Sequence, residues 1–201
     1  EMEWLEQGLQ MQPGRGRRFY FIGGDSGVGE SRLLDECRIG VQIKGIKFFK
    51  THCREGDLGP FGPLVRMLDY IFVELDPDMR IFSSYGPDLK RFFPARYGIL
   101  DQGDLQASEA DIKAGRRRMF DNLLLYLDHL ISEQNLIVAL EDLQWADRDT
   151  LDFIEFLWSN RSTESSVYFI CTGQTVPDGS APSFLTDDDA CYRILKPANR
   201  K

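Results

Sequence analysis

Residues 24–31 have the glycine spacing of a loop that binds phosphate groups. Such spacing lets consecutive backbone N–H groups converge on an anion at the N-terminus of the following helix. Ser31 supplies the hydroxyl group that holds Mg²⁺ in loops of this kind. We therefore predict a site for a phosphate-bearing ligand at Gly24, Asp25, Ser26, Gly27, Val28, Gly29, Glu30, Ser31 and Arg32. A glycine-rich turn without a ligand is the alternative.

The loop departs from the pattern G-x-x-x-x-G-K-[ST] at one position, because Glu30 stands where the pattern has lysine. Two unit charges about 4 Å apart interact by roughly 4 kcal/mol at an effective dielectric constant near 20. Exchanging attraction for repulsion therefore weakens phosphate binding by several kcal/mol. The same carboxylate stabilises an empty helix N-terminus by roughly 0.3–1 kcal/mol. We expect weak or absent hydrolysis; the alternative is that Glu30 turns into solvent and binding survives.

An acidic pair follows the apolar residues 136–140, which have the character of a strand buried on both faces. Parallel sheets place their ligands at the carboxyl ends of the strands, where Glu141 and Asp142 would lie. We predict that both are catalytic, with Glu141 as a ligand of Mg²⁺ and the second acid orienting the attacking water. The usual order of such a pair is Asp then Glu, so the reversal puts the catalytic-base role in doubt. A solvated pair at a strand end is the alternative.

Strand patterns alternate with helical patterns along the chain, which predicts an α/β fold with a mainly parallel sheet. The expected strands span residues 18–23, 46–53, 135–140, 167–171 and 192–195, and the expected helices span residues 3–12, 31–43, 64–76 and 148–160. A further long helix is expected after Gly115, and Asp147 is expected to cap the helix that follows it. Residues 77–112 have no clear pattern and are expected to form a surface region.

Composition excludes several classes of function. A net charge of −8 argues against direct nucleic-acid binding, and no apolar run is long enough to cross a membrane. The cysteines Cys37, Cys53, Cys171 and Cys191 lack metal-site spacing, so we expect reduced thiols in a cytoplasmic protein. His52 beside Cys53 is poorly placed as a catalytic pair, because adjacent strand residues point to opposite faces.

Several segments together resemble one family. They are the loop at 24–31 with Arg32-Leu33-Leu34, Cys53 with residues 60–63, residues 116–120, and Glu141-Asp142-Leu143-Gln144-Trp145-Ala146-Asp147. This combination resembles the AAA-type ATPase domain of the signal-transduction ATPases with numerous domains, and the likeness covers nearly the whole chain. It implies a three-layer P-loop NTPase sandwich with helices on both faces of a five-stranded sheet, order 5-1-4-3-2. It also implies ATP or ADP with Mg²⁺ as cofactor.

The same resemblance sets expectations for residue roles and partners. Gln174 stands where the family commonly has an arginine that senses the γ-phosphate, so a second expected cation is missing. The implied partners are neighbouring domains of the same larger chain, and self-association is a further candidate. We expect residues 1–201 to form one domain of a longer protein and to act as a nucleotide-binding regulatory module. The alternative function is a pseudo-ATPase scaffold or protein-interaction domain that binds no nucleotide.

Overall fold

The computed structural model describes residue 5, residues 18–25, 27–56, 59–76, 81, 89, 109–131, 135–160, 167–174 and 192–196. The chain divides into two compact units. The first consists of Glu1–Pro63 and Glu133–Lys201, and the second is Leu64–Ser132. The candidate site residues all belong to the first unit. The expectation of a single domain over residues 1–201 stays a prediction.

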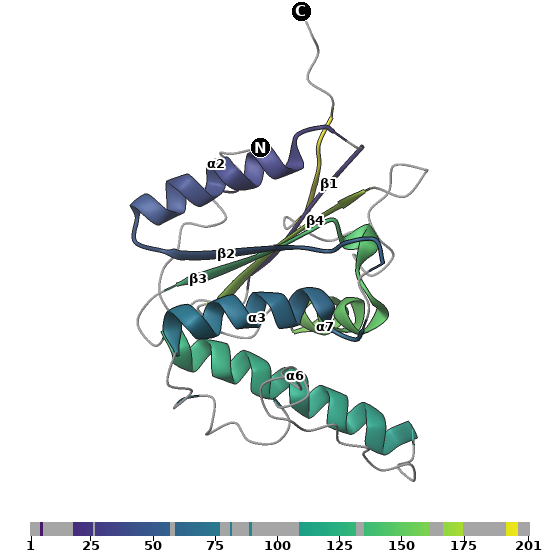
Figure 1. Cartoon of the computed structure of the whole chain (residues 1–201). Helices are drawn as coiled ribbons and strands as arrows, with labels where there is room; N and C mark the ends of the chain where they lie inside the picture. Colours follow the sequence, from purple (N-terminus) through teal and green to yellow (C-terminus); the bar gives the residue numbers. More distant parts are fainter. Residues whose placement is uncertain are drawn as a thin grey trace, which may run out of the picture. The chain divides into compact units, whose positions relative to one another are not determined.

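The first unit is built on a five-stranded sheet (Figure 1). Its strands are β1 (Arg18–Gly24), β2 (Lys47–His52), β3 (Leu136–Glu141), β4 (Val167–Gln174) and β5 (Tyr192–Ile194). The order across the sheet is β2-β3-β4-β1-β5, and each neighbouring pair is parallel. This confirms the α/β fold class and the strand order 5-1-4-3-2, which is the same order read from the other edge.

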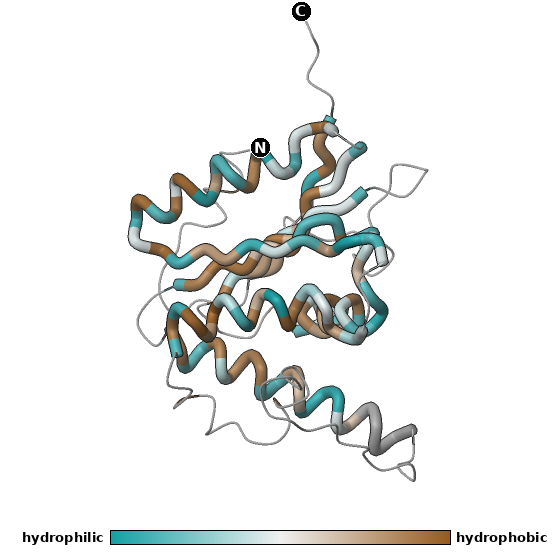
Figure 2. Tube along the Cα trace, in the orientation of Figure 1, coloured by the Kyte–Doolittle hydropathy of each residue, from teal (hydrophilic) through white to brown (hydrophobic). Residues whose placement is uncertain are grey.

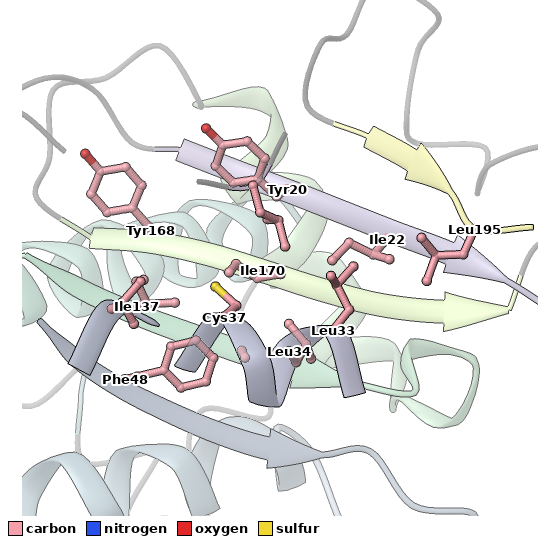
Figure 3. Packing of buried hydrophobic residues seen from close by; sticks show 13 residues of the cluster. Tyr20, Ile22, Leu33, Leu34, Cys37, Phe48, Ile137, Tyr168, Ile170 and Leu195 are labelled. Carbon is pink, nitrogen blue, oxygen red and sulfur yellow. The ribbon is translucent and has the colours of Figure 1, made fainter. Parts of the chain in front are cut away.

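Alternating residues of the strands supply two apolar faces, one for α2 (Glu30–Ile43) and one for α7 (Arg148–Ser159). On the α2 face, Leu34 and Cys37 of the helix pack with strand residues such as Ile22 and Ile170 (Figure 3). On the opposite face, the Phe19 ring lies 5.6 Å from the Trp158 ring of α7. Helices therefore cover both faces of the sheet, as predicted (Figure 1).

The second unit contains α3 (Gly62–Leu75, whose first two residues belong to the first unit) and α6 (Glu109–Ile131). Figure 2 shows apolar residues along one side of α6, and the rings of Phe72 and Tyr126 lie 5.5 Å apart between the two helices. The long helix expected after Gly115 is present, but its start was placed too late, because the helix begins at Glu109. A glycine inside a helix costs only about 1 kcal/mol, so Gly115 need not mark its boundary.

Two further expectations concern regions that are described only in part. Of the expected helix at 3–12, only Leu5 lies within the described residues, where it is helical and completely buried. Of residues 77–108, only Ile81 and Leu89 are described. Among the described residues, none of the helices is both long and apolar enough to cross a membrane.

Candidate functional site

The loop between β1 and α2 has the backbone conformation that its glycines permit. Gly27 and Gly29 have φ angles of 82° and 111°, a region that side-chain-bearing residues rarely adopt. A side chain at Gly24 would collide with the side chain of Val28. The Val28 N–H donates to the Asp25 carbonyl at 3.1 Å and closes the turn. Of the predicted loop residues, Ser26 lies outside the described part of the chain.

Glu30 is the first residue of α2, and its carboxyl group is directed into the site. Partial burial raises the pKa of Glu30 to about 7, and the charges of Asp142 and Glu141 add to the rise. Its Oε1 atom is buried and has no hydrogen-bond partner among the described residues. The side chain therefore does not turn into solvent, and it adds a third acidic group next to the predicted pair.

The two residues after Glu30 differ from it in exposure. Ser31 and Arg32 are both exposed at the start of α2. The Arg32 guanidinium donates to Glu36 at 2.9 Å along the outer side of the helix, with 84% of its side chain exposed. Arg32 thus points away from the carboxylates and does not compensate for the missing lysine. The Arg116-Arg117-Arg118 segment is another candidate source of positive charge in the sequence, and it belongs to the second unit.

Glu141 is the last residue of β3, and its side chain is 1% exposed. Two groups of β2 approach its Oε2 atom: His52 Nδ1 at 2.8 Å and Lys50 Nζ at 3.3 Å. Neither contact has the angles of a hydrogen bond, so both Glu141 carboxylate oxygens are buried without a hydrogen-bond partner among the described residues. Lys50 offsets part of the charge of Glu141, and the Glu141 oxygens keep their capacity to bind a ligand.

Asp142 adopts a left-handed backbone conformation (φ 62°, ψ 48°) at the turn after β3. Its N–H donates to the buried Thr172 hydroxyl at 3.3 Å, which ties the turn to β4. Gln144 forms a second tie, because its Nε2 donates to Asp142 and its Oε1 accepts from the Gln174 N–H at 3.1 Å. The backbone N–H of Gln174 is therefore linked to Asp142 of the acidic pair through Gln144, and Gln174 itself is exposed to solvent.

Asp147 caps α7, as predicted, and also fixes the loop after β2. Its Oδ1 accepts hydrogen bonds from the N–H groups of Thr150 at 2.9 Å and Phe61 at 3.0 Å. Its Oδ2 accepts from the Thr150 hydroxyl at 2.7 Å. Phe61 itself has a φ of 60°, so this bond holds an uncommon backbone conformation. The role of Asp147 is structural.

A cavity of about 280 Å³ lies beside the loop. Apolar side chains of the loop, α2 and the end of β5 line it together with charged ones: Val28, Gly29, Arg32, Leu33, Glu36, Leu195 and Lys196. Its volume is close to the lower end of the range found for small-molecule pockets in proteins. Lys196 is thus a cation at the rim that the loop pattern alone did not indicate.

Lys50, His52 and Asp35 were also missed by sequence reasoning, although one signal was present. Lys50 and His52 are two residues apart on a strand, so they share a face. What the pattern lacked was the register, which places His52 directly opposite Glu141. Asp35 joins them from α2, where it accepts a hydrogen bond from Lys50 at 2.9 Å.

The fit of these residues to Mg²⁺ depends on the oxygens that remain available. Glu141 offers buried carboxylate oxygens, and Ser31 offers an exposed hydroxyl. Within the described ranges, no group of three or more His, Cys, Asp or Glu side chains could hold a metal ion unaided. Mg²⁺ is commonly bound by one or two protein oxygens together with phosphate oxygens and water. The donor set therefore suits a metal that arrives with a phosphate ligand.

Comparison with protein families agrees with this geometry. The family model described as AAA ATPase domain matches residues 1–170. The chain belongs to the AAA ATPase domain family. The glycine loop of this AAA ATPase domain, the α2 N-terminus and the acidic end of β3 therefore lie in a fold whose family generally binds nucleotide with Mg²⁺.

Comparison with individual proteins adds little. Among curated proteins, the search found no match. Among solved structures, the AAA ATPase domain is similar to a chain in "Structure of Drosophila ORC bound to DNA", with a TM-score of 0.45 and 14% sequence identity. That match covers 90% of this chain and 81% of the other. A TM-score this low supports no functional conclusion.

Proposed function

We propose that this AAA ATPase domain is a nucleotide-binding regulatory module in which hydrolysis is weak or lost. The observation that carries the proposal is the position of Glu30. Its half-buried carboxyl group interacts with Glu141 and Asp142, so three acidic groups meet where phosphate and metal charges would be held. A P-loop lysine at this position would instead bring one positive charge to the same place.

Each remaining part of the site has a role that its geometry supports. The loop N–H groups at the α2 N-terminus would bind the terminal phosphates of ATP or ADP. Ser31 and Glu141 would hold Mg²⁺, which when bound would neutralise phosphate charge. Asp142 would orient a water molecule. The cavity lined by Val28, Leu33 and Leu195 would receive the less polar part of the nucleotide.

Weak hydrolysis follows from charge. Stabilisation of a phosphoryl-transfer transition state is mostly electrostatic, and it depends on cations close to the transferred group. Glu30 replaces one such cation by an acid, Arg32 pairs with Glu36 on the outer side of α2, and Gln174 carries no charge. We therefore infer that binding survives better than catalysis. Such a module would respond to nucleotide and pass the response to neighbouring domains of a longer cytoplasmic chain.

One observation favours the second candidate, a pseudo-ATPase scaffold that binds no nucleotide. Glu141 is approached by Lys50 and His52, so part of its charge is offset without any ligand. A different observation opposes it. A scaffold that uses Glu30 as an internal anion should satisfy both oxygens of that side chain, yet Oε1 has no hydrogen-bond partner among the described residues.

Calorimetric titration with ADP and ATP in the presence of Mg²⁺ tests the proposal. We expect binding with a dissociation constant of roughly 0.1–1 mM, or about −4 to −5.5 kcal/mol, and phosphate release close to the uncatalysed background. Adenosine serves as the matched ligand, because it lacks the phosphates and should bind far more weakly. No heat and no thermal shift at millimolar ADP would support the scaffold. Rapid phosphate release would contradict the role given to Glu30.

A further inference from the structure

The α2-facing side of β2 and β3 changes from apolar to charged at its carboxyl end. On β2, Phe48 is buried in the core cluster, and Lys50 and His52 follow it on the same face. On β3, Ile137 and Ala139 belong to that cluster, and Glu141 continues their alternation. The apolar core beneath α2 therefore ends in a cluster of charged groups.

Lys50 is shared between two carboxylates of unequal burial. Its Nζ donates to Asp35 Oδ1 of α2 at 2.9 Å and lies 3.3 Å from Glu141 Oε2. The side chain of Asp35 is 46% exposed, whereas that of Glu141 is 1% exposed. Partial burial works against the charge of Lys50, but the hydrogen bond to Asp35 and the charge of Glu141 outweigh it and raise the pKa of Lys50. The Lys50 ammonium group is therefore a cation placed between two carboxylates at the border of the site.

The ion pair between Lys50 and Glu141 leaves lone pairs of the Glu141 carboxylate available to a further ligand. Both Glu141 carboxylate oxygens lack a hydrogen bond from the described residues, although His52 also lies close to Oε2. Carboxylate oxygens are the ligands that Mg²⁺ prefers. A metal ion at Glu141 and an ammonium group 3.3 Å from the same carboxylate would repel each other. The two cations must therefore compete for this residue.

We propose that Lys50 is a built-in counter-ion of Glu141 that a divalent cation must displace towards Asp35 before it can bind. The inference rests on the proposed function, which makes Glu141 a metal ligand. Lys50 is a positioning residue in this scheme, and Asp35 is the partner that retains it when the metal arrives. The site is consequently biased towards its metal-free state, which adds to the effect of Glu30.

Direct metal titration tests the competition without any nucleotide. Mn²⁺ is the probe, because the free ion is visible by electron paramagnetic resonance, and the full chain is used. Lys50→Met removes the competitor, so we expect Mn²⁺ to bind about tenfold more tightly, which is 1.4 kcal/mol. Asp35→Asn leaves Glu141 as the carboxylate partner of Lys50 within the described part of the chain, so we expect binding at least about threefold weaker, roughly 0.65 kcal/mol.

Two matched variants separate this competition from general changes in charge. Lys44→Met removes a cation at the exposed end of α2, and Glu55→Gln removes an exposed acid three residues beyond His52. Each should change Mn²⁺ affinity by less than about twofold. Circular dichroism establishes that every variant is folded. If Lys50→Met does not fold, Asp35→Asn at the half-exposed position still decides the question.

Opposite shifts in the two variants support the proposal, because a merely structural cluster would not change metal affinity in both directions. Equal Mn²⁺ binding in all proteins, or none in Lys50→Met, overturns it. So does a loss of ADP affinity in EDTA for Lys50→Met with unchanged Mn²⁺ binding, since Lys50 would then be a phosphate ligand. ADP binding by the unmodified protein is measured separately, so failure of the proposed function is distinguishable from failure of this inference.

Discussion

Glu141 ends β3 and Asp147, six positions later, caps α7, and the surroundings of these two acids differ. Asp147 accepts three hydrogen bonds, from two N–H groups and one hydroxyl, and so joins α7 to the loop after β2. Glu141 is more deeply buried, yet its carboxylate oxygens accept none from the described residues. Glu30 resembles Glu141, because its Oε1 is also buried and accepts no hydrogen bond within the described part of the chain.

We propose that the difference separates a structural carboxylate from the carboxylates of the proposed nucleotide site. A buried acceptor without a partner costs about 1–3 kcal/mol, so a fold selected for stability alone would satisfy it. Unsatisfied groups of this kind gather at sites that bind a ligand, and the local structure around them compensates. The hydrogen bonds of Asp147 stabilise two such segments, the loop after β2 and the start of α7. The contrast yields four predictions.

The first prediction concerns Glu30→Lys, which replaces the partly buried acid at the start of α2 by a cation. Repulsion of the nucleotide phosphates becomes attraction, so we expect ADP affinity to rise at least about 100-fold, or 2.7 kcal/mol. Calorimetric titration measures the change. Glu55→Lys, with the same charge exchange at an exposed position, should change the affinity by less than about threefold. An unchanged affinity in Glu30→Lys would show that Glu30 does not face the phosphates.

The second prediction concerns Asp147→Ala, which removes the carboxylate that accepts three hydrogen bonds. Loss of the α7 cap and of the bond to Phe61 should lower the free energy of unfolding by about 2–3 kcal/mol. Urea denaturation followed by circular dichroism measures it. Asp149→Ala, in the first turn of the same helix, should cost less than about 1 kcal/mol. Equal losses in the two variants would remove the distinction between Asp147 and an ordinary helix-terminal acid.

The third prediction is a pH dependence caused by Glu30. The folded pKa of about 7 exceeds the ordinary value of 4.5, so the folded protein binds this proton more tightly than the unfolded chain does. Stability from this group is complete below pH 4.5 and is lost as the pH rises to about 7. Allowing for solvent screening of a half-exposed group, the loss is about 1–2 kcal/mol. Thermal unfolding at several pH values should show a smaller slope in Glu30→Gln.

The fourth and smallest effect concerns Gln144, which connects Asp142 to the Gln174 backbone. Gln144→Ala removes both hydrogen bonds at an exposed position, so we expect a loss of about 0.5–1 kcal/mol. Differential scanning calorimetry measures it against Gln42→Ala, an exposed residue of α2 that should cost less than about 0.5 kcal/mol. A loss larger than that of Asp147→Ala would show that Gln144 contributes more than Asp147 to the stability of the segments after β3.

The sequence was sufficient to predict features that depend on local pattern. The apolar run before Glu141 predicted a buried strand, and every residue of β3 is buried. The glycines of the loop predicted its turn, and Asp147 predicted the start of α7. Gly115 misled the assignment of the start of α6, because a single glycine was read as a boundary although the helix continues through it.

Features that depend on strand register, or on where charged side chains lie in the folded chain, could not be predicted from local sequence patterns. That His52 lies opposite Glu141 follows from how β2 pairs with β3, and no local pattern in either strand specifies it. The proximity of Lys50 to both Asp35 and Glu141 requires α2 to be placed over that pair. The position of the Glu30 carboxyl group was equally open, since a residue at a helix start can face solvent or the site.

The position of Glu30 decides whether the site is impaired, and its pKa reports that position most directly. Nuclear magnetic resonance of protein with ¹³C-labelled glutamate side chains, assigned by comparison with Glu30→Gln, gives the pKa from the carboxyl chemical shift. We predict a pKa of about 7 in the nucleotide-free protein. A value of about 4.5, the ordinary value for glutamate, would contradict the placement of Glu30 beside Glu141 and Asp142.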